Sequence, residues 1–374
     1  MTKTIQPAVR IGVVAASLDI VGGQGIQADA LVTHLRAEGV DVSVVPVNPR
    51  FPRPLAWIRR VPVLRTIVNE LFYLPSLVSL RSADVVHVFS ASYWSFLLGP
   101  VPAMLMARLF RKRVVLNYHS GEADDHLSRW GVLVHPGLRL AHAIVVPSRY
   151  LHDVFARHGY HADVIPNIVD TSAFRYRERK MTGPHLLSTR NLESHYGVDV
   201  IVRAYELVKH RYPGATLTVA GYGREEGPLQ SLARTRQLRD VRFVGRQEPE
   251  EMPGLYDRSE IFLNASVVDN QPVSVLEAFA AGLPVISTST GDLINMIGHD
   301  CGVVVPPADP AAMADAVAAL IERPRVATRI ARRARRTLDA HTWNHVRAAW
   351  HAVYRRPEAL ARCASTDMYV SESR

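Results

Sequence analysis

The chain has 374 residues, of which 48% are hydrophobic and 21% are charged, a composition that excludes a disordered chain and a small disulfide-stapled scaffold. At roughly 150 residues per domain, this length predicts two domains. Lys and Arg exceed Asp and Glu to give a net charge of +9, which indicates an anionic partner such as nucleic acid, a lipid headgroup or a phosphate-bearing small molecule.

Short apolar runs and helical segments alternate in the first half of the sequence. Strands of a parallel sheet that is covered on both faces are continuously apolar rather than alternating. Five runs of this kind occur, at residues 9–16, 40–47, 85–89, 113–118 and 143–147. After the first run, residues 26–38 have helical spacing, and Gly39 is placed to end that helix. The pattern predicts a doubly wound α/β sheet.

The same alternation begins again after residue 167. Five more short strands are predicted, at residues 186–188, 215–220, 241–244, 261–264 and 283–287. The predicted helices cover residues 200–211, 226–236, 273–281 and 310–322. The charged stretch at residues 175–183 is the predicted linker between two α/β domains, whose ligands would bind at the carboxyl ends of the strands.

Three features favour a cytoplasmic protein without a membrane span. Two cysteines, Cys301 and Cys363, are too sparse for a disulfide framework or a zinc ribbon. Residues 1–10 are polar, unlike a secretory leader. Residues 85–107 carry no Asp, Glu, Lys or Arg, but a Gly-Pro-Val-Pro sequence interrupts them, so a buried strand, a turn and a helix are expected there.

Glycines follow the first predicted strand. At Gly22, Gly23 and Gly25 backbone N–H groups could approach an anion, and the helix after them adds its positive end. The spacing also matches a dinucleotide fingerprint, but the second strand ends without the acidic residue that binds a ribose, which disfavours an NAD-dependent dehydrogenase. A flexible loop that packs helix against sheet is the alternative.

His119 closes the fourth predicted strand, where a histidine would point toward a ligand at the sheet edge. The nearby residues Glu122, Asp124, Asp125 and His126 also suggest a metal site. Their spacing fits no pattern of metal ligands, so a solvated acidic loop is expected and no metal site is predicted.

Two turns in the second half follow predicted strands. Arg190 could present its guanidinium to phosphate oxygens in a forked arrangement, with a surface salt bridge as the alternative. Gly221 lies in a tight strand-to-helix turn.

The most informative segment covers residues 269–286. Pro272 suits the first turn of a helix, and Gly282 suits the position just past its end. The N–H groups at the start of this helix would then be available to a phosphate. Asp269 and Glu277 add two carboxylates, eight positions apart, that could accept hydrogen bonds from a hydroxyl-rich ligand such as a sugar nucleotide.

These motifs together resemble those of the family 4 retaining glycosyltransferases of the GT-B fold, over nearly the whole chain. The string LEAFAAGLPVIST at residues 276–288 is close to the most recognisable motif of that family, and VIPNIVD at residues 164–170 stands where the family usually has VIPNGVD. Residues 188–190 and 217–223 stand at the GRL and LxIxGxG positions, and Asp269 to Glu277 at the Glu-x7-Glu motif.

The resemblance implies an α/β architecture of two Rossmann-like, doubly wound domains that face a cleft. Residues 1–170 would form the acceptor-side domain and residues 171–340 the domain that binds the nucleotide sugar. Residues 341–362 would form a helix that crosses back to the first domain, followed by a tail at residues 363–374.

The resemblance also assigns roles. Three residues would be catalytic: Arg190 at the diphosphate leaving group, and Asp269 and His119 at the transferred sugar. Glu277 would hold the nucleotide ribose. The other implied donor contacts are Gly22, Gly23, Tyr196, Gly221, Val244, Asn270, Gln271, Pro272, Val273 and Ser274.

The implied reaction moves a hexosyl group from a UDP- or GDP-linked sugar to a glycan or lipid-linked acceptor with retention of anomeric configuration. In the family's same-face displacement, the departing phosphate accepts the acceptor's proton. No metal ion or other cofactor is implied.

The sequence departs from the family pattern in two places. Asp269 is one methylene shorter than the usual Glu. The usual Lys before a Gly is missing, because His195 and Tyr196 precede Gly197. An oriented charge at a developing anion is worth several kcal/mol, so turnover would be slow unless Arg190, His195 or another basic residue compensates.

The positive charge concentrates in the first half, where residues 1–168 hold 17 Lys and Arg against 11 Asp and Glu. Six arginines lie among bulky apolar residues in the segment from Arg50 to Arg81, with Glu70 as its one acid. This pattern predicts a peripheral contact with an anionic membrane at the inner face of the cell. An ordinary helical pair with solvated arginines is the alternative.

A second basic run, residues 323–336, contains seven arginines at the spacing of an amphipathic surface helix. It has no stacking aromatics, so nucleic acid is not an expected partner.

The alternatives to a glycosyltransferase are a nucleotide-sugar epimerase or hydrolase of the same fold, and a non-catalytic GT-B scaffold.

Overall fold

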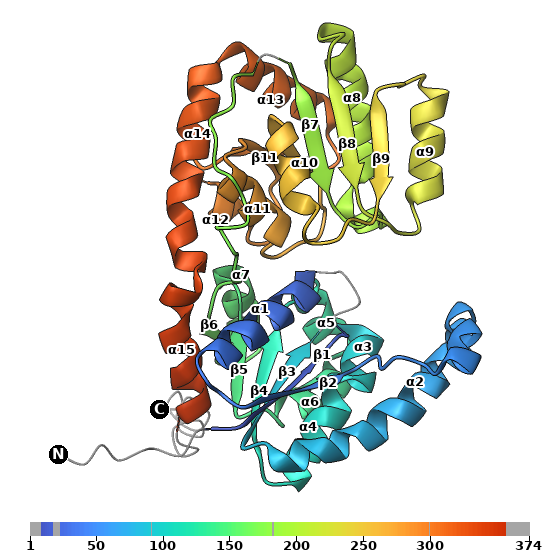
Figure 1. Ribbon diagram of the computed structural model, residues 1–374, viewed down its shortest axis with the longest axis vertical. Helices are drawn as coiled ribbons and strands as arrows, with labels where there is room; N and C mark the ends of the chain where they lie inside the picture. Colours follow the sequence, from blue (N-terminus) through green and yellow to red (C-terminus); the bar gives the residue numbers. More distant parts are fainter. Residues whose placement is uncertain (1–8, 18–22, 91, 182, 299, 357–374) are drawn as a thin grey trace, which may run out of the picture. The chain divides into compact units, whose positions relative to one another are not determined.

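The computed structural model describes residues 9–17, 23–90, 92–181, 183–298 and 300–356 (Figure 1). The chain divides into two compact units. The first unit consists of the described residues up to Pro166 and those from Val346 onward, and the second is Asn167–His345.

The first unit contains a six-stranded, all-parallel sheet in the order β2-β1-β3-β4-β5-β6. Its strands are β1 (Ile11–Ala15), β2 (Val42–Pro46), β3 (Val85–Ser90), β4 (Arg113–Tyr118), β5 (Ala143–Val146) and β6 (Asp163–Val164). The first five confirm the predicted strands to within two residues at either end. The sixth is an additional edge strand of two residues.

Helices connect these strands in the predicted alternation. They are α1 (Gly23–Ala37), η1 (Arg53–Arg60), α2 (Pro62–Ser76), η2 (Leu77–Ser82), α3 (Tyr93–Leu98), α4 (Pro100–Leu109), α5 (Ala123–Arg129), α6 (Gly131–Leu138) and α7 (Arg149–Arg157). As expected, residues 85–107 form a buried strand, a turn and helices. By length and composition alone, the one helical segment of the described residues that could cross a membrane is Val63–Ser82.

The second unit repeats this architecture with the strand order β12-β11-β10-β7-β8-β9. Its strands are β7 (His185–Thr189), β8 (Thr216–Ala220), β9 (Val241–Gly245), β10 (Ile261–Asn264), β11 (Val285–Thr288) and β12 (Val303–Val305). Its helices are η3 (Ser194–Tyr196), α8 (Val198–Arg211), α9 (Glu226–Thr235), α10 (Met252–Arg258), α11 (Val273–Ala281), α12 (Leu293–Ile297), α13 (Pro310–Glu322), α14 (Pro324–Thr337) and η4 (Leu338–His341).

The central strands of the sheet of the second unit are buried on both faces, which explains why β10 and β11 are continuously apolar. Leu186 and Leu187 are both buried, yet they belong to different hydrophobic clusters because successive side chains of a strand point to opposite faces. The cluster with Leu186 includes α8 and α13, and the cluster with Leu187 includes α10 and α11.

The charged stretch at residues 175–183 is not a free linker, contrary to the prediction. Arg177 donates to the Asp257 carboxylate (2.9 Å), and Arg179 donates to the carbonyls of Asp257 (2.8 Å) and Ala281 (2.6 Å). Its arginines satisfy carbonyl groups of α10 and α11, so the stretch is part of the second unit.

The predicted crossing helix is confirmed as α15 (Trp343–Arg355), whose residues from Val346 onward pack on the first unit. The Tyr354 hydroxyl lies 2.8 Å from His87 Nδ1 on the central strand β3, and the Trp350 ring centroid lies 5.0 Å from that of His87. Beyond the helix, Arg356 forms a forked ion pair with Asp163 of β6 (2.9 and 3.1 Å).

Candidate active site

The helix α11 brings the most characteristic sequence motif to the carboxyl ends of strands β7 and β10. Pro272 precedes the helix with a φ of −68°, and Gly282 ends it at a φ of +80°, a left-handed conformation that glycine adopts without strain. Its apolar residues, among them Leu276 and Phe279, are buried. The helix is therefore fixed in the core on nearly every side.

The first turn of α11 offers backbone donors. The N–H groups that open a helix have no partner four residues earlier, and the helix dipole favours negative charge at this end. Val275 N–H turns back to the Pro272 carbonyl (3.1 Å), which leaves the amides of Val273 and Ser274 as the donors of this turn. Such an arrangement suits a phosphate oxygen.

Arg190 lies beside this turn, at the end of β7. Its guanidinium forms an ion pair with Asp269, donates to Ser274 Oγ (3.2 Å) and lies over the Tyr196 ring at 4.2 Å from the centroid. The Arg190 and Asp269 side chains are only 10% and 12% exposed, so this is no solvated surface salt bridge. Arg190 Nε is buried and has no partner among the described residues, which leaves one donor for a ligand.

Glu277 projects from the second turn of α11 and receives a hydrogen bond from the Tyr256 hydroxyl (2.7 Å). Burial raises the pKa of the Glu277 carboxyl, and the Tyr256 hydrogen bond and the nearby Arg190 charge oppose that rise. The Tyr256 hydroxyl also lies 2.7 Å from Thr189 Oγ1 and 3.1 Å from the Ser274 carbonyl oxygen. Tyr256 therefore joins β7, α10 and α11, a role that no sequence motif signalled.

A glycine permits the close approach of two strand ends. Gly221 has a φ of +148°, and a Cβ there would lie 1.9 Å from the Arg190 carbonyl oxygen. Gly221 N–H donates to the carbonyl of Gly245 (2.8 Å), next to Val244 on β9. The predicted contacts Gly221 and Val244 thus lie at the ends of neighbouring strands, with the Arg190 backbone beside them.

Gln271, which precedes α11, holds the segment at the start of the second unit, where Asn167 lies. Gln271 Oε1 accepts the Asn167 N–H (2.8 Å), and the Gln271 carbonyl accepts Asn167 Nδ2 (2.9 Å). The Asn270 N–H donates to Asp269 Oδ1 (2.9 Å). In this state Gln271 is engaged with Asn167, and its role in donor binding stays a prediction.

Comparison with known proteins decides the family. Residues 170–337 match the model described as Glycosyl transferases group 1, and residues 21–173 match that of Glycosyltransferase Family 4. Over 288 residues the chain is 32% identical to the glycogen synthase of Mycobacterium tuberculosis, which covers 72% of this chain and 68% of that protein. The chain is a family 4 glycosyltransferase.

Solved structures show the fold of this glycosyltransferase to be GT-B. The sucrose-phosphate synthase of Thermosynechococcus elongatus superposes with a TM-score of 0.75 at 19% identity, over 94% of this chain and 100% of that one. The Anabaena HepE protein in complex with UDP and glucose gives a TM-score of 0.71 at 15% identity, over 93% and 100% of the two chains.

In the first unit of the glycosyltransferase, His119 follows β4, and its N–H donates to the Ser90 carbonyl (3.2 Å). Its ring packs against Phe89, with the centroids 5.4 Å apart, and Nε2 is buried without a partner among the described residues. Burial lowers the pKa of His119 to about 4, so the imidazole is neutral near pH 7.

The glycine turn differs from the prediction. Gly22 lies outside the described residues, and Gly23 and Gly25 belong to the first turn of α1 rather than to a loop before it. Gly23 is exposed, and no atom of the described residues lies within 4 Å of a Cβ placed on it. The side chain of Gln24 donates to the Ser90 carbonyl (2.7 Å), which ties this turn to β3 beside the His119 backbone.

The acidic residues after His119 form helix α5 and pair with neighbours rather than with one another. Asp124 pairs with Arg157 (3.0 Å), and Asp125 pairs with Arg129 (2.8 Å) and accepts the Tyr93 hydroxyl (2.7 Å). Among the described residues, no group of three His, Cys, Asp or Glu side chains is placed to hold a metal ion. Metal independence stays a prediction.

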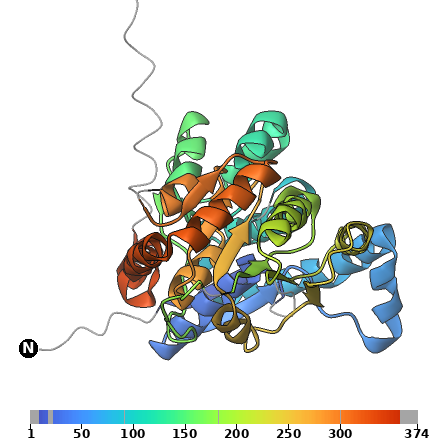
Figure 2. The ribbon, with the colours of Figure 1, turned by 90° about the horizontal axis from the view of Figure 1, so that it is seen from above.

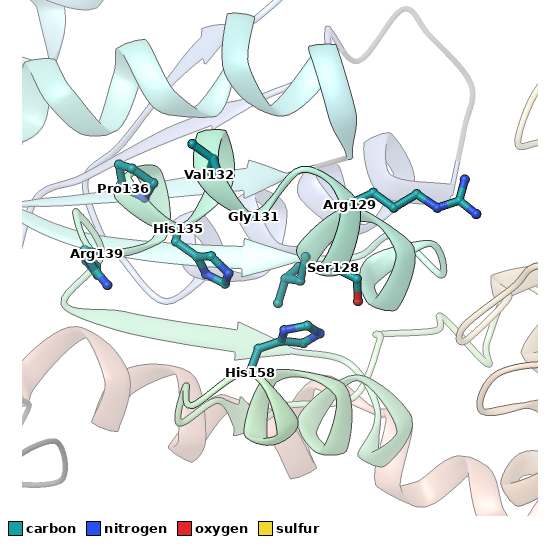
Figure 3. Close-up of a pocket in the computed structure, with 9 residues that line it drawn as sticks. Ser128, Arg129, Gly131, Val132, His135, Pro136, Arg139 and His158 are labelled. Carbon is teal, nitrogen blue, oxygen red and sulfur yellow. The ribbon is translucent and has the colours of Figure 1, made fainter. Parts of the chain in front are cut away.

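A cavity in the first unit, with a volume of about 530 Å³, is lined by residues of α5 and α6, by Arg139 and by His158, which follows α7 (Figure 3). The rings of His135 and His158 approach it from two sides with their centroids 6.1 Å apart, while Arg129 extends away. None of the predicted site residues lines this cavity, so it is separate from the candidate active site.

Proposed function

We propose that this glycosyltransferase moves a hexosyl group from a UDP- or GDP-linked sugar to a glycan or lipid-linked acceptor, with retention and without a metal ion or other cofactor. The observation that carries the proposal is the meeting of Arg190, Asp269 and Ser274 at the N-terminus of α11, one helical turn from Glu277. A cation and helix amides suit a diphosphate, and carboxylates suit the hydroxyls of sugar and ribose.

In the proposed reaction the bond between the anomeric carbon and the diphosphate oxygen breaks, and the acceptor oxygen bonds to that carbon on the same face. The departing phosphate takes the acceptor's proton, so charge and protons balance. Negative charge develops on the leaving phosphate, where Arg190 and the amides of Val273 and Ser274 can stabilise it without reorganisation. Glu277 would hold the ribose, and Asp269 a sugar hydroxyl.

Two observations bear on the role of His119. Its neutral imidazole, with a pKa lowered to about 4, can donate to or accept from a sugar hydroxyl but is a poor proton donor at pH 7. Its buried Nε2 is unpaired among the described residues, which suits a ligand hydroxyl. We therefore assign His119 a sugar-positioning role, consistent with the departing phosphate as the base.

Similar proteins support a nucleotide-sugar donor. The HepE structure contains UDP and glucose, and another HepE structure contains UDP-glucose. Relatives named for a lipid acceptor include the phosphatidyl-myo-inositol mannosyltransferase of Propionibacterium freudenreichii, which is 26% identical over 230 residues. These names favour both the proposed nucleotide-sugar donor and the proposed lipid-linked acceptor.

Calorimetric titration with UDP, GDP and their sugars tests the proposed donor. Glu277→Ala should abolish nucleotide binding, whereas Arg190→Ala should lower turnover about a hundredfold with a smaller loss of binding. Glu250→Ala, which removes an exposed carboxylate of the same unit, is the matched control. Near-wild-type transfer by Glu277→Ala would refute the site assignment.

The same assays separate the alternatives. An epimerase or hydrolase of this fold would consume the donor with no acceptor present, and a scaffold would bind no nucleotide. Retention is read from the anomeric proton coupling of the product by NMR. Activity that disappears with a chelator and returns with a divalent cation would refute metal independence.

We also propose that α2 rests on an anionic membrane, which would place the enzyme at the cytoplasmic face. Figures 1 and 2 show η1 and α2, in blue, at the outer edge of the first unit. Five exposed apolar side chains of α2 and the following η2 repeat at helical spacing: Val63, Ile67, Leu71, Leu74 and Val78. A stripe of this size on a soluble surface is typical of a membrane or protein contact.

The opposite side of the segment argues for a surface contact rather than a span. Tyr73, Leu77 and Leu80 are fully buried, and the Tyr73 hydroxyl donates to the Gly99 carbonyl (2.7 Å). Crossing the bilayer would remove these side chains from the core of the first unit. Arg65 and Arg81 are exposed near the two ends of the stripe, where they can meet lipid phosphates.

A further inference from the structure

A second strongly basic feature lies in the second unit, away from the candidate active site. A groove of about 980 Å³ separates residues 179–180 of the entering segment from helix α14. Figure 1 shows that segment, in green, running beside α14. The groove is lined by Arg179, Lys180, Pro324, Arg325, Thr328, Arg329, Arg332, Arg333, Arg336 and Thr337.

Most of this charge is not neutralised by the protein. Arg332 pairs with Glu178 and Arg333 with Asp300 (3.5 Å). The other exposed cations, Lys180, Arg325, Arg329 and Arg336, form no ion pair with a described residue. Arg325, Arg329, Arg332 and Arg336 follow one another at intervals of three or four residues, so they share one face of α14. Their mutual repulsion disfavours this arrangement unless an anion binds.

Arg179 is an independent sign of a ligand on the opposite wall. It is 3% exposed and lines the groove, and its Nε is buried without a partner among the described residues. Burial, together with the nearby Arg177, lowers the pKa of Arg179 to about 10. A buried guanidinium with an unsatisfied donor at the edge of a basic groove is a costly arrangement that an anion would relieve.

We propose that this groove binds a compact small molecule that carries several phosphate groups. The guanidinium groups of α14 can fork onto phosphate oxygens, Lys180 adds an ammonium from the other wall, and the volume matches that of small-molecule sites. The lining contains no aromatic side chain on which nucleic-acid bases could stack, and no large apolar side chain that would enter a lipid layer. A soluble polyphosphorylated ligand is the class that fits this lining.

The groove is distinct from the proposed donor site. Arg179 donates to the carbonyl of Ala281 at the end of α11, whereas the donor site uses the beginning of that helix. At 1.5 Å per residue, the nine residues of α11 separate the two by about 13 Å. Binding in the groove can therefore be tested without any assumption about the donor.

The test is calorimetric titration of the full chain with inorganic tripolyphosphate at fixed ionic strength. Arg329→Glu with Arg336→Glu should weaken binding at least about tenfold, since two charge-assisted contacts are reversed. The control pair, Arg234→Glu with Arg239→Glu, makes the same charge change on exposed arginines elsewhere in the unit and should alter affinity less than about twofold. Circular dichroism melting checks that both pairs fold.

One further variant and two further probes complete the experiment. Arg190→Ala should keep the tripolyphosphate binding that depends on Arg329 and Arg336, because Arg190 lies at the other site. Loss of that binding in Arg190→Ala, equal loss in both charge-reversed pairs, or no binding by wild type would each overturn the proposal. The proposal would also be overturned if the chain bound anionic phospholipid vesicles or a 20-nucleotide single strand more tightly than tripolyphosphate, in a way that depends on Arg329 and Arg336. A chain that bound tripolyphosphate this way but no nucleotide would refute the proposed function alone.

Discussion

At the scale of single residues, the site shows how the chain meets its departures from the family pattern. The carboxylate of Asp269 is shorter than the usual Glu, but both of its oxygens are engaged, one by Arg190 and the other by the Asn270 N–H. The residue at the missing Lys position, Tyr196, supplies no charge, yet its ring stacks on the Arg190 guanidinium. A fixed guanidinium loses less conformational entropy when it binds a phosphate.

This stacking predicts different outcomes for two substitutions of Tyr196. Tyr196→Phe keeps the ring and should retain most of the turnover, whereas Tyr196→Leu should lower kcat about three- to tenfold, the range of an exposed to partly buried cation–π contact. Steady-state kinetics with saturating donor measures the difference. Equal effects of Phe and Leu would show that the ring does not orient Arg190.

Tyr256 provides a pH test of Glu277. Donor hydroxyls require the ionised carboxylate, so nucleotide affinity should fall as the pH drops through the Glu277 pKa. Burial raises this pKa and the Tyr256 hydrogen bond lowers it, so Tyr256→Phe should move the loss of affinity to higher pH. Calorimetry across pH 4 to 8 measures the midpoint.

Tyr205→Phe is the control for this experiment. It removes another buried hydroxyl of the second unit, one that donates to the Ala215 carbonyl (2.8 Å). It should leave the acid midpoint of nucleotide binding unchanged. If the midpoint shifts equally in both variants, or in neither, the Tyr256 hydrogen bond does not control the pKa of Glu277.

The contrast between Asp269 and Tyr256 shows what the sequence could predict of the site. Asp269, Glu277 and Arg190 lie at strand ends or in a helix with clear start and stop residues, so local patterns were enough to place them. Tyr256 lies in α10, outside every motif, and reaches the site only through the tertiary packing of α10 against α11. No local pattern encodes such a contact.

At the scale of elements, length and exposure separated the strands that could be predicted from those that could not. Most of the ten predicted strands are apolar runs that are buried along nearly their whole length, whereas β2, β8 and β9 have partly exposed positions. The missed strands, β6 and β12, are two and three residues long and lie at sheet edges, with half-exposed residues. The glycine turn was misplaced because Gly23 and Gly25 have low helix propensity, yet α1 includes both.

The apolar stripe of α2 supports a prediction at the same scale. Ile67→Glu with Leu71→Glu places two charges in the stripe, so binding to anionic vesicles should fall at least about tenfold. Both side chains are more than half exposed, so the fold should persist. Flotation with and without anionic lipid measures binding.

A matched pair controls for added charge. Val132→Glu with Leu133→Glu changes two exposed apolar residues of α6 in the same unit and should float as wild type does. If neither pair changes flotation, or if wild type does not float, the stripe serves another purpose.

At the scale of the whole molecule, the net charge of +9 is distributed over functionally different surfaces. Arg190 is largely neutralised by Asp269 and would bind the proposed donor. The arginines near α2 flank an apolar stripe, whereas those of α14 line a groove without large apolar residues. The three proposed anions would thus meet the same residue type in different surroundings, which net charge alone does not distinguish.

The first unit also contains three histidines that are held neutral by burial, and this predicts acid sensitivity. Burial lowers the pKa values of His87 to about 3 and of His119 and His126 to about 4, from a usual 6.5. The unfolded chain therefore binds more protons than the folded one between these values. Stability is complete above about pH 6.5 and is lost as the pH falls below it, by about 1.4 kcal/mol per pH unit for each histidine.

His87→Phe isolates one of these contributions. The side chain stacks on Phe89 and lies against Trp350 and Tyr354, so an aromatic ring should fit, at the loss of the Tyr354 hydrogen bond. The variant should be less stable at pH 8. Between pH 6.5 and 4.5, however, its free energy of unfolding should fall less steeply than that of wild type, by about 1.4 kcal/mol per pH unit, which is the contribution of one histidine. Urea titrations at several pH values measure this slope for the first unit, with the exposed His161→Gln as control. An unchanged slope in His87→Phe would mean that the acid sensitivity arises from other groups, because no other ionisable side chain is altered in that variant.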